Sequence, residues 1–295
     1  MSTPAIGFIG LGLMGAAMAG RLLDQGYALT ITANRSRVNI DKAVSRGAAE
    51  VGTAREVAEA SDIVMLCMDT SVSVEARMRG ADGVIAGLRK DAVVIDFGTS
   101  LPGSTRTLGA EAAAVGGHYL DAPLGRTPAH AKDGLLNIMA AGDKTVFDRV
   151  EPVLKDLGEN VFHLGALGAG HTIKLLNNFF GMTVANAMAE AFAMADVAGI
   201  ERKSVYDVMS AGPLHSGMMD FVKGYGVDGD ATQLEFAIKN AAKDVGYYAT
   251  MAQNAGVDSI MAKGTLSALT QARDAGQGDD MVSQMVDFYV ARFKV

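Results

Sequence analysis

One lysine stands out among the residues that could do chemistry. Lys174 follows the glycine-containing run Gly165–Gly170, which predicts a helix start, and the next charged residue after it is Glu190. Asn178 lies four residues on, so both side chains project from one helix face. Burial and the positive end of a helix both disfavour an ammonium group, so we expect a lowered pKa and a proton donor suited to neutral pH. The alternative is a lysine whose ammonium reaches water from the helix end.

A second motif lies near the N-terminus. Gly10, Gly12 and Gly15 form Gly-x-Gly-x-x-Gly directly after an apolar run expected as a strand and before an expected helix. In such a unit the first glycine permits a tight turn, the second lets a pyrophosphate approach the backbone, and the third lets helix and strand pack closely. A turn without a ligand is the alternative. We expect dinucleotide contacts from Gly10, Leu11, Gly12, Leu13, Met14 and Gly15.

The residues after the second expected strand bear on the type of dinucleotide. Thr32–Arg37 holds no acidic residue to bind an adenosine 2′-hydroxyl. Asn34, Arg35 and Ser36 suit a 2′-phosphate, so NADP(H) is favoured, with NAD(H) as the other option. The alternative is a solvated turn that carries ordinary surface arginines.

Short apolar runs alternate with helical patterns over residues 1–164, which predicts a Rossmann-type α/β domain with a parallel, doubly wound sheet. The expected strands are Ala5–Ile9, Ala28–Thr32, Ile63–Cys67, Ala92–Asp96, Tyr119–Ala122, Leu136–Ala140 and Val161–His163. The expected helices include Met14–Gln25, Arg55–Glu59, Ser104–Val115 and Thr145–Leu157.

Residues 165–295 show no strand pattern and predict an all-helical domain. Its expected helices are Gly170–Val197, Arg202–Met209, Leu234–Asn254, Ile260–Ala272 and Asp280–Phe293. The first would span roughly 40 Å and is apolar on several sides, so it needs cover from neighbours. We therefore expect a homodimer or homotetramer built around it.

The composition excludes several classes of function. A net charge of −7 over 295 residues argues against nucleic acid, although one local pocket can still hold a small anion. No uncharged run is long enough to cross a membrane, and the sequence shows no signal-peptide pattern. Cys67 is the only cysteine, so we expect a core thiol in a cytoplasmic protein. The five histidines show no metal-ligand spacing, so no metal is expected.

Taken together, the motifs resemble the β-hydroxyacid dehydrogenase family, which includes 3-hydroxyisobutyrate dehydrogenase and tartronate semialdehyde reductase. The resemblance spans essentially the whole chain. It rests on Phe8–Gly15, Asp121–Pro123, Gly165–Asn178, Phe236 and Lys243-Asp244. It implies that Lys174 is the catalytic acid/base and that Asn178 binds substrate. Asn177, next to it, is a further candidate substrate contact. The resemblance also implies that the loop Asp96–Ser100 lies beside the nicotinamide and that Lys243 closes over the site. We expect Thr99 to contact both the cofactor and the anionic end of the substrate, and Phe236 and Lys243 to contact the cofactor.

The chain departs from the family pattern at three places. Cys67-Met68-Asp69 replaces the usual Met-Leu-Pro, so Met68 and Asp69 are the expected cofactor contacts there. Ala33 falls at the cofactor-discriminating position unless one residue is inserted. The substrate motif Asp-Ala-Pro-Val-Ser-Gly-Gly becomes Asp121-Ala-Pro-Leu-Gly125-Arg126-Thr127, which is similar to the sulfolactaldehyde reductase branch of the family.

These residues set the expected substrate, a small anionic aldehyde or its alcohol. Arg126 brings a fixed cation, and a sulfonate offers three oxygens to Arg126, Thr127 and the backbone of the Gly125 loop. The alternative is that Arg126 pairs with a neighbouring carboxylate and the substrate is an ordinary carboxylate of the 3-hydroxyisobutyrate, tartronate semialdehyde or succinic semialdehyde class. Imine reduction and a non-catalytic dinucleotide-binding module are the rival functions. We expect Asp121 to cap the turn after its strand, and His130 and His171 to lie at the surface or at helix ends.

Overall fold

The structure is a computed structural model that describes residues 3–33 and 36–293. The chain divides into two compact units, Met1–Lys174 and Leu175–Val295. The division after residue 164 expected from the sequence stays a proposal.

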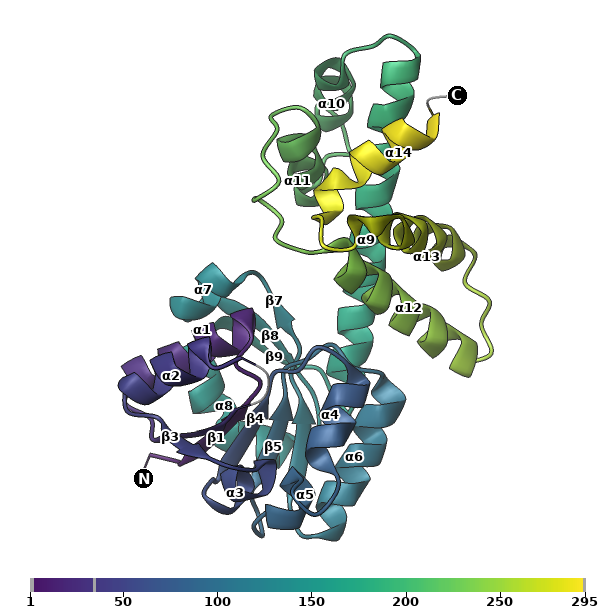
Figure 1. Cartoon of the computed structure of the whole chain (residues 1–295). Coiled ribbons are helices and arrows are strands. Elements are labelled where there is room, and N and C mark those ends of the chain that lie inside the picture. Colours follow the sequence, from purple (N-terminus) through teal and green to yellow (C-terminus); the bar gives the residue numbers. More distant parts are fainter. Residues whose placement is uncertain (1–2, 34–35, 294–295) are drawn as a thin grey trace. The chain divides into compact units, whose positions relative to one another are not determined.

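The first unit contains a six-stranded sheet with the strand order β3-β2-β1-β4-β5-β6 (Figure 1). All of its neighbouring strands are parallel, and Phe8 pairs with Ile31 on one side and Met65 on the other. This order is that of a doubly wound dinucleotide-binding sheet, as expected. The strands are β1 (Ile6–Ile9), β2 (Leu29–Thr32), β3 (Ala49–Val51), β4 (Ile63–Leu66), β5 (Val93–Asp96) and β6 (His118–Asp121).

Helices cover both faces of this sheet, because successive side chains of a strand point to opposite faces. Phe8 belongs to one buried cluster and its neighbour Ile9 to another. The Phe8 cluster includes side chains of α1 (Leu13–Asp24), α2 (Val38–Ser45), α7 (Pro128–Lys132) and α8 (Lys144–Leu157). The Ile9 cluster includes side chains of α3 (Ala54–Glu59), α4 (Ser71–Met78), α5 (Val84–Gly87) and α6 (Pro102–Ala114).

A second, three-stranded sheet corrects the expectation that every strand joins one parallel sheet. It consists of β7 (Leu124–Gly125), β8 (Leu136–Ala140) and β9 (Gly158–His163). β7 pairs antiparallel with β8, and β8 pairs parallel with β9. Hydrophobic periodicity finds a strand but not its partner, so β8 and β9 were placed in the wrong sheet.

The second unit is helical and packs around side chains such as Phe192, Ile238, Leu269 and Val286. Its helices are α9 (Ala169–Val197, which begins in the first unit), α10 (Arg202–Ser210), α11 (Gly217–Gly226), α12 (Ile238–Asn254), α13 (Ile260–Ala272) and α14 (Met285–Phe293), with short π and 3₁₀ turns at Arg273–Gln277 and Val282–Gln284. The sequence did not predict α11, whose three glycines lower helix propensity. Within the described residues after β9, strand-like pairing is limited to the bridge between Ala237 and Met281.

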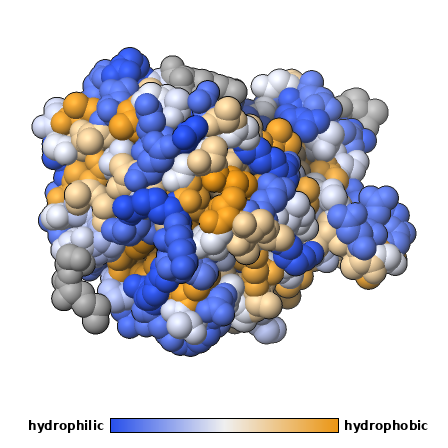
Figure 2. Space-filling view, turned by 90° about the horizontal axis from the view of Figure 1, so that it is seen from below, coloured by the Kyte–Doolittle hydropathy of each residue, from blue (hydrophilic) through white to orange (hydrophobic). Residues whose placement is uncertain are grey.

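The surface is mixed in character. On the face that Figure 2 shows, hydrophilic side chains surround several patches of apolar ones. Of the helices within residues 3–33 and 36–293, none combines the length and apolar character needed to cross a membrane.

Candidate active site

The three glycines after β1 differ in what requires them. Gly10 has a φ of +100°, and a Cβ there would collide with the Cys67 carbonyl oxygen. A Cβ at Gly15 would collide with the Gly10 carbonyl oxygen. The chain's own packing therefore requires the first and third glycines.

Gly12 is different, because a Cβ there would meet no described atom within 4 Å. The open space lies at the start of α1, which has no side-chain cap among the described residues and no acidic residue in its first turn. A helix start of this kind attracts an anion. These residues fit the pyrophosphate of a dinucleotide, and Gly12 is the position where a ligand, rather than the fold, would require a glycine.

The other expected cofactor residues in the first unit lie in different surroundings. Leu13 is 83% exposed, and Leu11 accepts a hydrogen bond from Asn39 Nδ2 through its carbonyl oxygen (2.8 Å). Met14, Met68 and Thr99 are half-buried, whereas Asp69 and Ser36 are exposed. The structure gives no account of Asn34 and Arg35, which lie outside the described residues.

Lys174 lies in the second turn of α9 and is half-buried. Its Nζ donates a hydrogen bond to the Leu124 carbonyl oxygen (2.7 Å). Leu124 opens the segment that continues with Gly125, Arg126 and Thr127. The fold thus brings the candidate proton donor beside the segment expected to bind the substrate's anionic end, across a separation of 50 residues in the chain.

Arg126 adopts a left-handed backbone conformation with a φ of 76°, which favours glycine. Its guanidinium donates to the Leu135 carbonyl oxygen (2.7 Å) and to Glu159 Oε2 (2.6 Å). Both side chains keep solvent contact. This is the pairing with a neighbouring carboxylate that the sequence left as an alternative. Thr127 Oγ1 lies 2.8 Å from His130 Nδ1, so its hydroxyl also has a partner.

Asp121 has a larger structural role than the expected cap of a turn. Its Oδ1 accepts from the Gly168 backbone N–H and its Oδ2 from that of His171, both at 2.7 Å, so it caps the start of α9. His171 lies in the first turn of α9, one of the two expected places, but it is fully buried and not at the surface. Its contacts come from β5, β6 and α6, and the residues next to it in the sequence do not predict them.

In the second unit, Asn178 is buried and its Nδ2 donates to Asp244 Oδ2 (2.6 Å). Lys243 Nζ lies 3.0 Å from Asp244 Oδ1 and 5.5 Å from the centre of the Tyr247 ring. Asp244 therefore joins two expected functional residues, a role that the sequence did not reveal. Asn177 is exposed, and Phe236 is half-buried.

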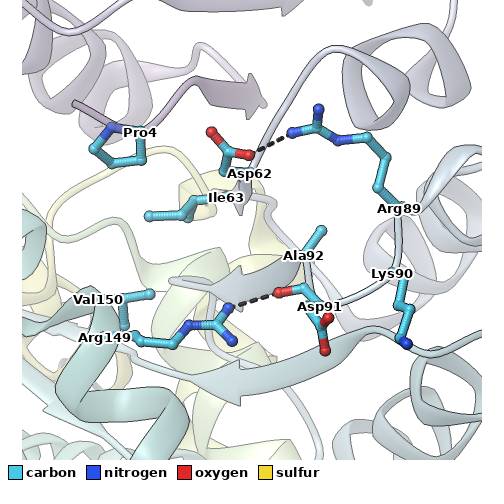
Figure 3. Close-up of a pocket in the computed structure, with 9 residues that line it drawn as sticks. All are labelled: Pro4, Asp62, Ile63, Arg89, Lys90, Asp91, Ala92, Arg149 and Val150. Carbon is cyan, nitrogen blue, oxygen red and sulfur yellow. Dashed lines mark hydrogen bonds and ion pairs between the residues drawn. The ribbon is translucent and has the colours of Figure 1, made fainter. Parts of the chain in front are cut away.

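A cavity of about 390 Å³ lies at the amino ends of the parallel strands, whereas Gly10 follows the carboxyl end of β1. Figure 3 shows the Arg89 guanidinium paired with Asp62 and that of Arg149 bound to the Asp91 carbonyl oxygen, both at 2.6 Å. Dinucleotides bind at the carboxyl ends of such sheets, so this cavity is not the cofactor site.

Within residues 3–33 and 36–293, no three His, Cys, Asp or Glu side chains gather in a manner that could hold a metal ion.

Comparisons with known proteins agree over nearly the whole chain. Residues 5–165 match the family described as the NAD binding domain of 6-phosphogluconate dehydrogenase, and residues 168–289 match that described as NAD-binding of NADP-dependent 3-hydroxyisobutyrate dehydrogenase. The 2-hydroxy-3-oxopropionate reductase of Escherichia coli K12 is 35% identical over 207 residues, which cover 70% of each chain. The 3-sulfolactaldehyde reductase of the same organism is 30% identical over 277 residues, 93% of this chain and 92% of that one.

A solved structure gives the same picture of the fold. The 3-hydroxyisobutyrate dehydrogenase of Mycobacterium tuberculosis, with L-serine, superposes with a TM-score of 0.85 at 24% identity and covers 97% of this chain and 99% of its own.

Proposed function

The chain belongs to the β-hydroxyacid dehydrogenase family and is an NAD(P)-dependent oxidoreductase, and we propose that it interconverts a small anionic semialdehyde and its primary alcohol. The observation that carries this proposal is the 2.7 Å bond between Lys174 Nζ and the Leu124 carbonyl oxygen. It puts an ammonium group next to the segment Gly125–Thr127, which offers a glycine, an arginine and a hydroxyl in succession.

The chemistry follows from what these residues can donate. Bound NAD(P)H would supply the hydride that reduces the aldehyde carbon. Lys174 gives a proton from Nζ to the carbonyl oxygen in reduction and takes it back in oxidation. The Leu124 carbonyl oxygen fixes the ammonium in place, which saves the cost of ordering a long side chain at the moment of reaction. The N–H and O–H groups of Gly125–Thr127 hold the anionic end of the substrate.

For the substrate itself, we propose a three-carbon sulfonated aldehyde. The Gly125-Arg126-Thr127 segment supports this proposal, as does the similarity to the 3-sulfolactaldehyde reductase over 93% of the chain. Arg126 also holds a backbone conformation that costs about 1–2 kcal/mol for a residue with a Cβ, a strain that a binding role would explain.

The second candidate is a carboxylate semialdehyde, favoured by the ion pair of Arg126 with Glu159. A guanidinium already neutralised by a carboxylate has less to offer a second anion. In this case only the backbone N–H groups of Gly125–Thr127 and the Thr127 hydroxyl would bind the substrate's carboxylate.

A panel of small semialdehydes separates these functions. Cofactor oxidation is measured with sulfonate and carboxylate aldehydes, an imine, and no substrate, each with NADH and NADPH. We expect turnover with anionic aldehydes and a higher kcat/KM for the sulfonate. Turnover with the imine alone would overturn the reaction type, and a preference for the carboxylate would overturn the proposed substrate.

We also propose that the chain forms a homodimer or homotetramer through its helical unit. Large apolar side chains of that unit remain exposed, with Phe180 at 69%. Others are Leu176, Met194, Val197, Ile200, Val208, Leu214, Val257, Ile260 and Met261. Exposed apolar groups in this number favour association. Light scattering at micromolar concentration should give a multiple of the 30.7 kDa chain mass, and a monomeric mass would contradict the proposal.

A further inference from the structure

Three fully buried titratable residues lie together in the first unit: Asp96, Asp121 and His171. They come from the ends of β5 and β6 and from the first turn of α9. Burial of ionisable groups costs free energy unless their neighbours compensate for the lost water. Such a cluster therefore needs a reason beyond the packing of the core.

The two carboxylates each hold a segment that the proposed reaction uses. Asp96 accepts from the Gly98 backbone N–H (2.9 Å) and from Ser100 Oγ (3.0 Å), which fixes the loop on either side of Thr99. Asp121 accepts from two backbone N–H groups at the start of α9, the helix that carries Lys174.

His171 lies between these carboxylates. Its Nε2 is 3.7 Å from Asp96 Oδ2 and its Nδ1 is 3.8 Å from Asp121 Oδ2. Nδ1 also lies 2.7 Å from Thr105 Oγ1, whereas Nε2 has no hydrogen-bond partner among the described residues. Burial raises the pKa of the Asp121 carboxyl, and the facing His171 lowers it. The ring thus faces both carboxylates at once, and each carboxylate holds one of the two segments.

Because His171 precedes Lys174 by three residues, the two are neighbours on α9. We propose that His171 is a positioning residue, which links the Thr99 loop to α9 through Asp96 and Asp121 and so fixes the position of Lys174. This inference rests on the proposed role of Lys174 as proton donor. A misplaced proton donor lowers the rate of reaction more than it weakens binding of the dinucleotide, whose pyrophosphate we expect to bind at Gly12.

The test replaces the imidazole by an apolar group of similar size. His171→Leu should lower kcat by roughly 10- to 100-fold while the KM for the dinucleotide stays within about twofold. His171→Gln, which keeps a polar group at the centre of the cluster, should recover most of the loss. His118→Leu is the matched control: His118 faces Asp91 at 3.7 Å from the amino end of β6, and its loss should leave kcat unchanged.

A second readout does not depend on turnover. The rate at which acetic anhydride modifies Lys174, read by peptide mass spectrometry, should rise in His171→Leu and not in His118→Leu, because the ammonium is less firmly held. If wild type reduces no aldehyde but His171→Leu still alters the labelling rate of Lys174, the proposed function is refuted and the positioning role stands. A kcat and a labelling rate equal to those of wild type would refute the positioning role alone.

A merely structural role predicts a different pattern: a lower Tm, with kcat per folded molecule unchanged and no recovery in His171→Gln. That pattern overturns the proposal. Should His171→Leu fail to fold, Thr105→Val decides, because it removes the hydroxyl beside Nδ1 with little change in shape. A kcat and labelling rate equal to wild type in Thr105→Val would then count against the proposal.

Discussion

The variant Arg126→Gly tests whether Arg126 binds the substrate or has only a structural role. If the guanidinium grips the anionic end of the aldehyde, its loss removes a charge-assisted hydrogen bond worth about 1.5–3 kcal/mol. That corresponds to a fall of roughly 10- to 100-fold in kcat/KM for a sulfonated aldehyde. A neutral aldehyde of similar size should lose much less.

The stability of the variant should change little, because opposing effects nearly cancel. Glycine relieves a φ of 76° that costs about 1–2 kcal/mol for other residues. Against this, the partly exposed pair with Glu159 is worth about 0.2–1 kcal/mol, and the bond to the Leu135 carbonyl about 0.5–1.5 kcal/mol. The greater freedom of glycine in the unfolded chain costs a further 0.4–1 kcal/mol or so. We expect a change in Tm of no more than about 4 °C.

Glu159→Gln is the matched control, since it removes the competing carboxylate and keeps Arg126. Steady-state kinetics on charged and neutral aldehydes, with thermal melts of both variants, give the comparison. In Glu159→Gln the kcat/KM for the sulfonate should hold or rise, because the guanidinium is released. Equal losses on charged and neutral aldehydes in Arg126→Gly would show that Arg126 has a structural role and does not bind the substrate.

The remaining predictions concern the cofactor site and the single thiol. Gly12→Ala should weaken dinucleotide binding about tenfold with little change in Tm. Gly10→Ala should lower Tm by several degrees, because Gly10 has a positive φ and Gly12 does not. Fluorescence titration measures the binding, and thermal melts measure Tm. NADPH should give a higher kcat/KM than NADH, and an equal or lower value would contradict the roles of Asn34, Arg35 and Ser36. Although Cys67 is only half-buried as a residue, burial of its thiol and then Asp96 raise its pKa from 9.0 to about 12. The thiolate is the reactive form, so Ellman's reagent at pH 8 should react slowly with native protein and rapidly after unfolding. Because the pKa is higher in the folded state, the protonated thiol contributes to the free energy of unfolding in full below pH 9, and this contribution is lost as the pH rises towards 12.

Local patterns predicted much of this fold. The glycine motif and five of the six strands of the parallel sheet could be predicted from the sequence. Both depend on residues close together in the chain: apolar runs that alternate with helical patterns, and glycines at the turns. The sequence did not predict the short strand β3, because two of its three residues are exposed and it lacks an apolar run. The pairing of β8 with β7 was also beyond prediction, because strand partners are chosen by tertiary packing.

The same limit applies to the candidate site. Lys174 and the Gly125–Thr127 segment were recognisable as residue types, but their contact spans 50 positions of the chain. Asp121 reaches Gly168 across 47 positions, and the left-handed backbone at Arg126 has no sequence signature. Burial of His171 followed from none of its neighbours in sequence, since it depends on Asp96 and Thr105 from other elements.

We propose that Lys174 supplies and removes the proton of an aldehyde–alcohol interconversion. The most direct measurement compares kcat of wild type and Lys174→Ala on the best anionic aldehyde, with the dinucleotide Kd measured in parallel by fluorescence. General acid–base assistance contributes about 10²–10⁴-fold, so kcat should fall by at least ~100-fold while Kd stays within about threefold. A kcat near that of wild type in Lys174→Ala would contradict the claim.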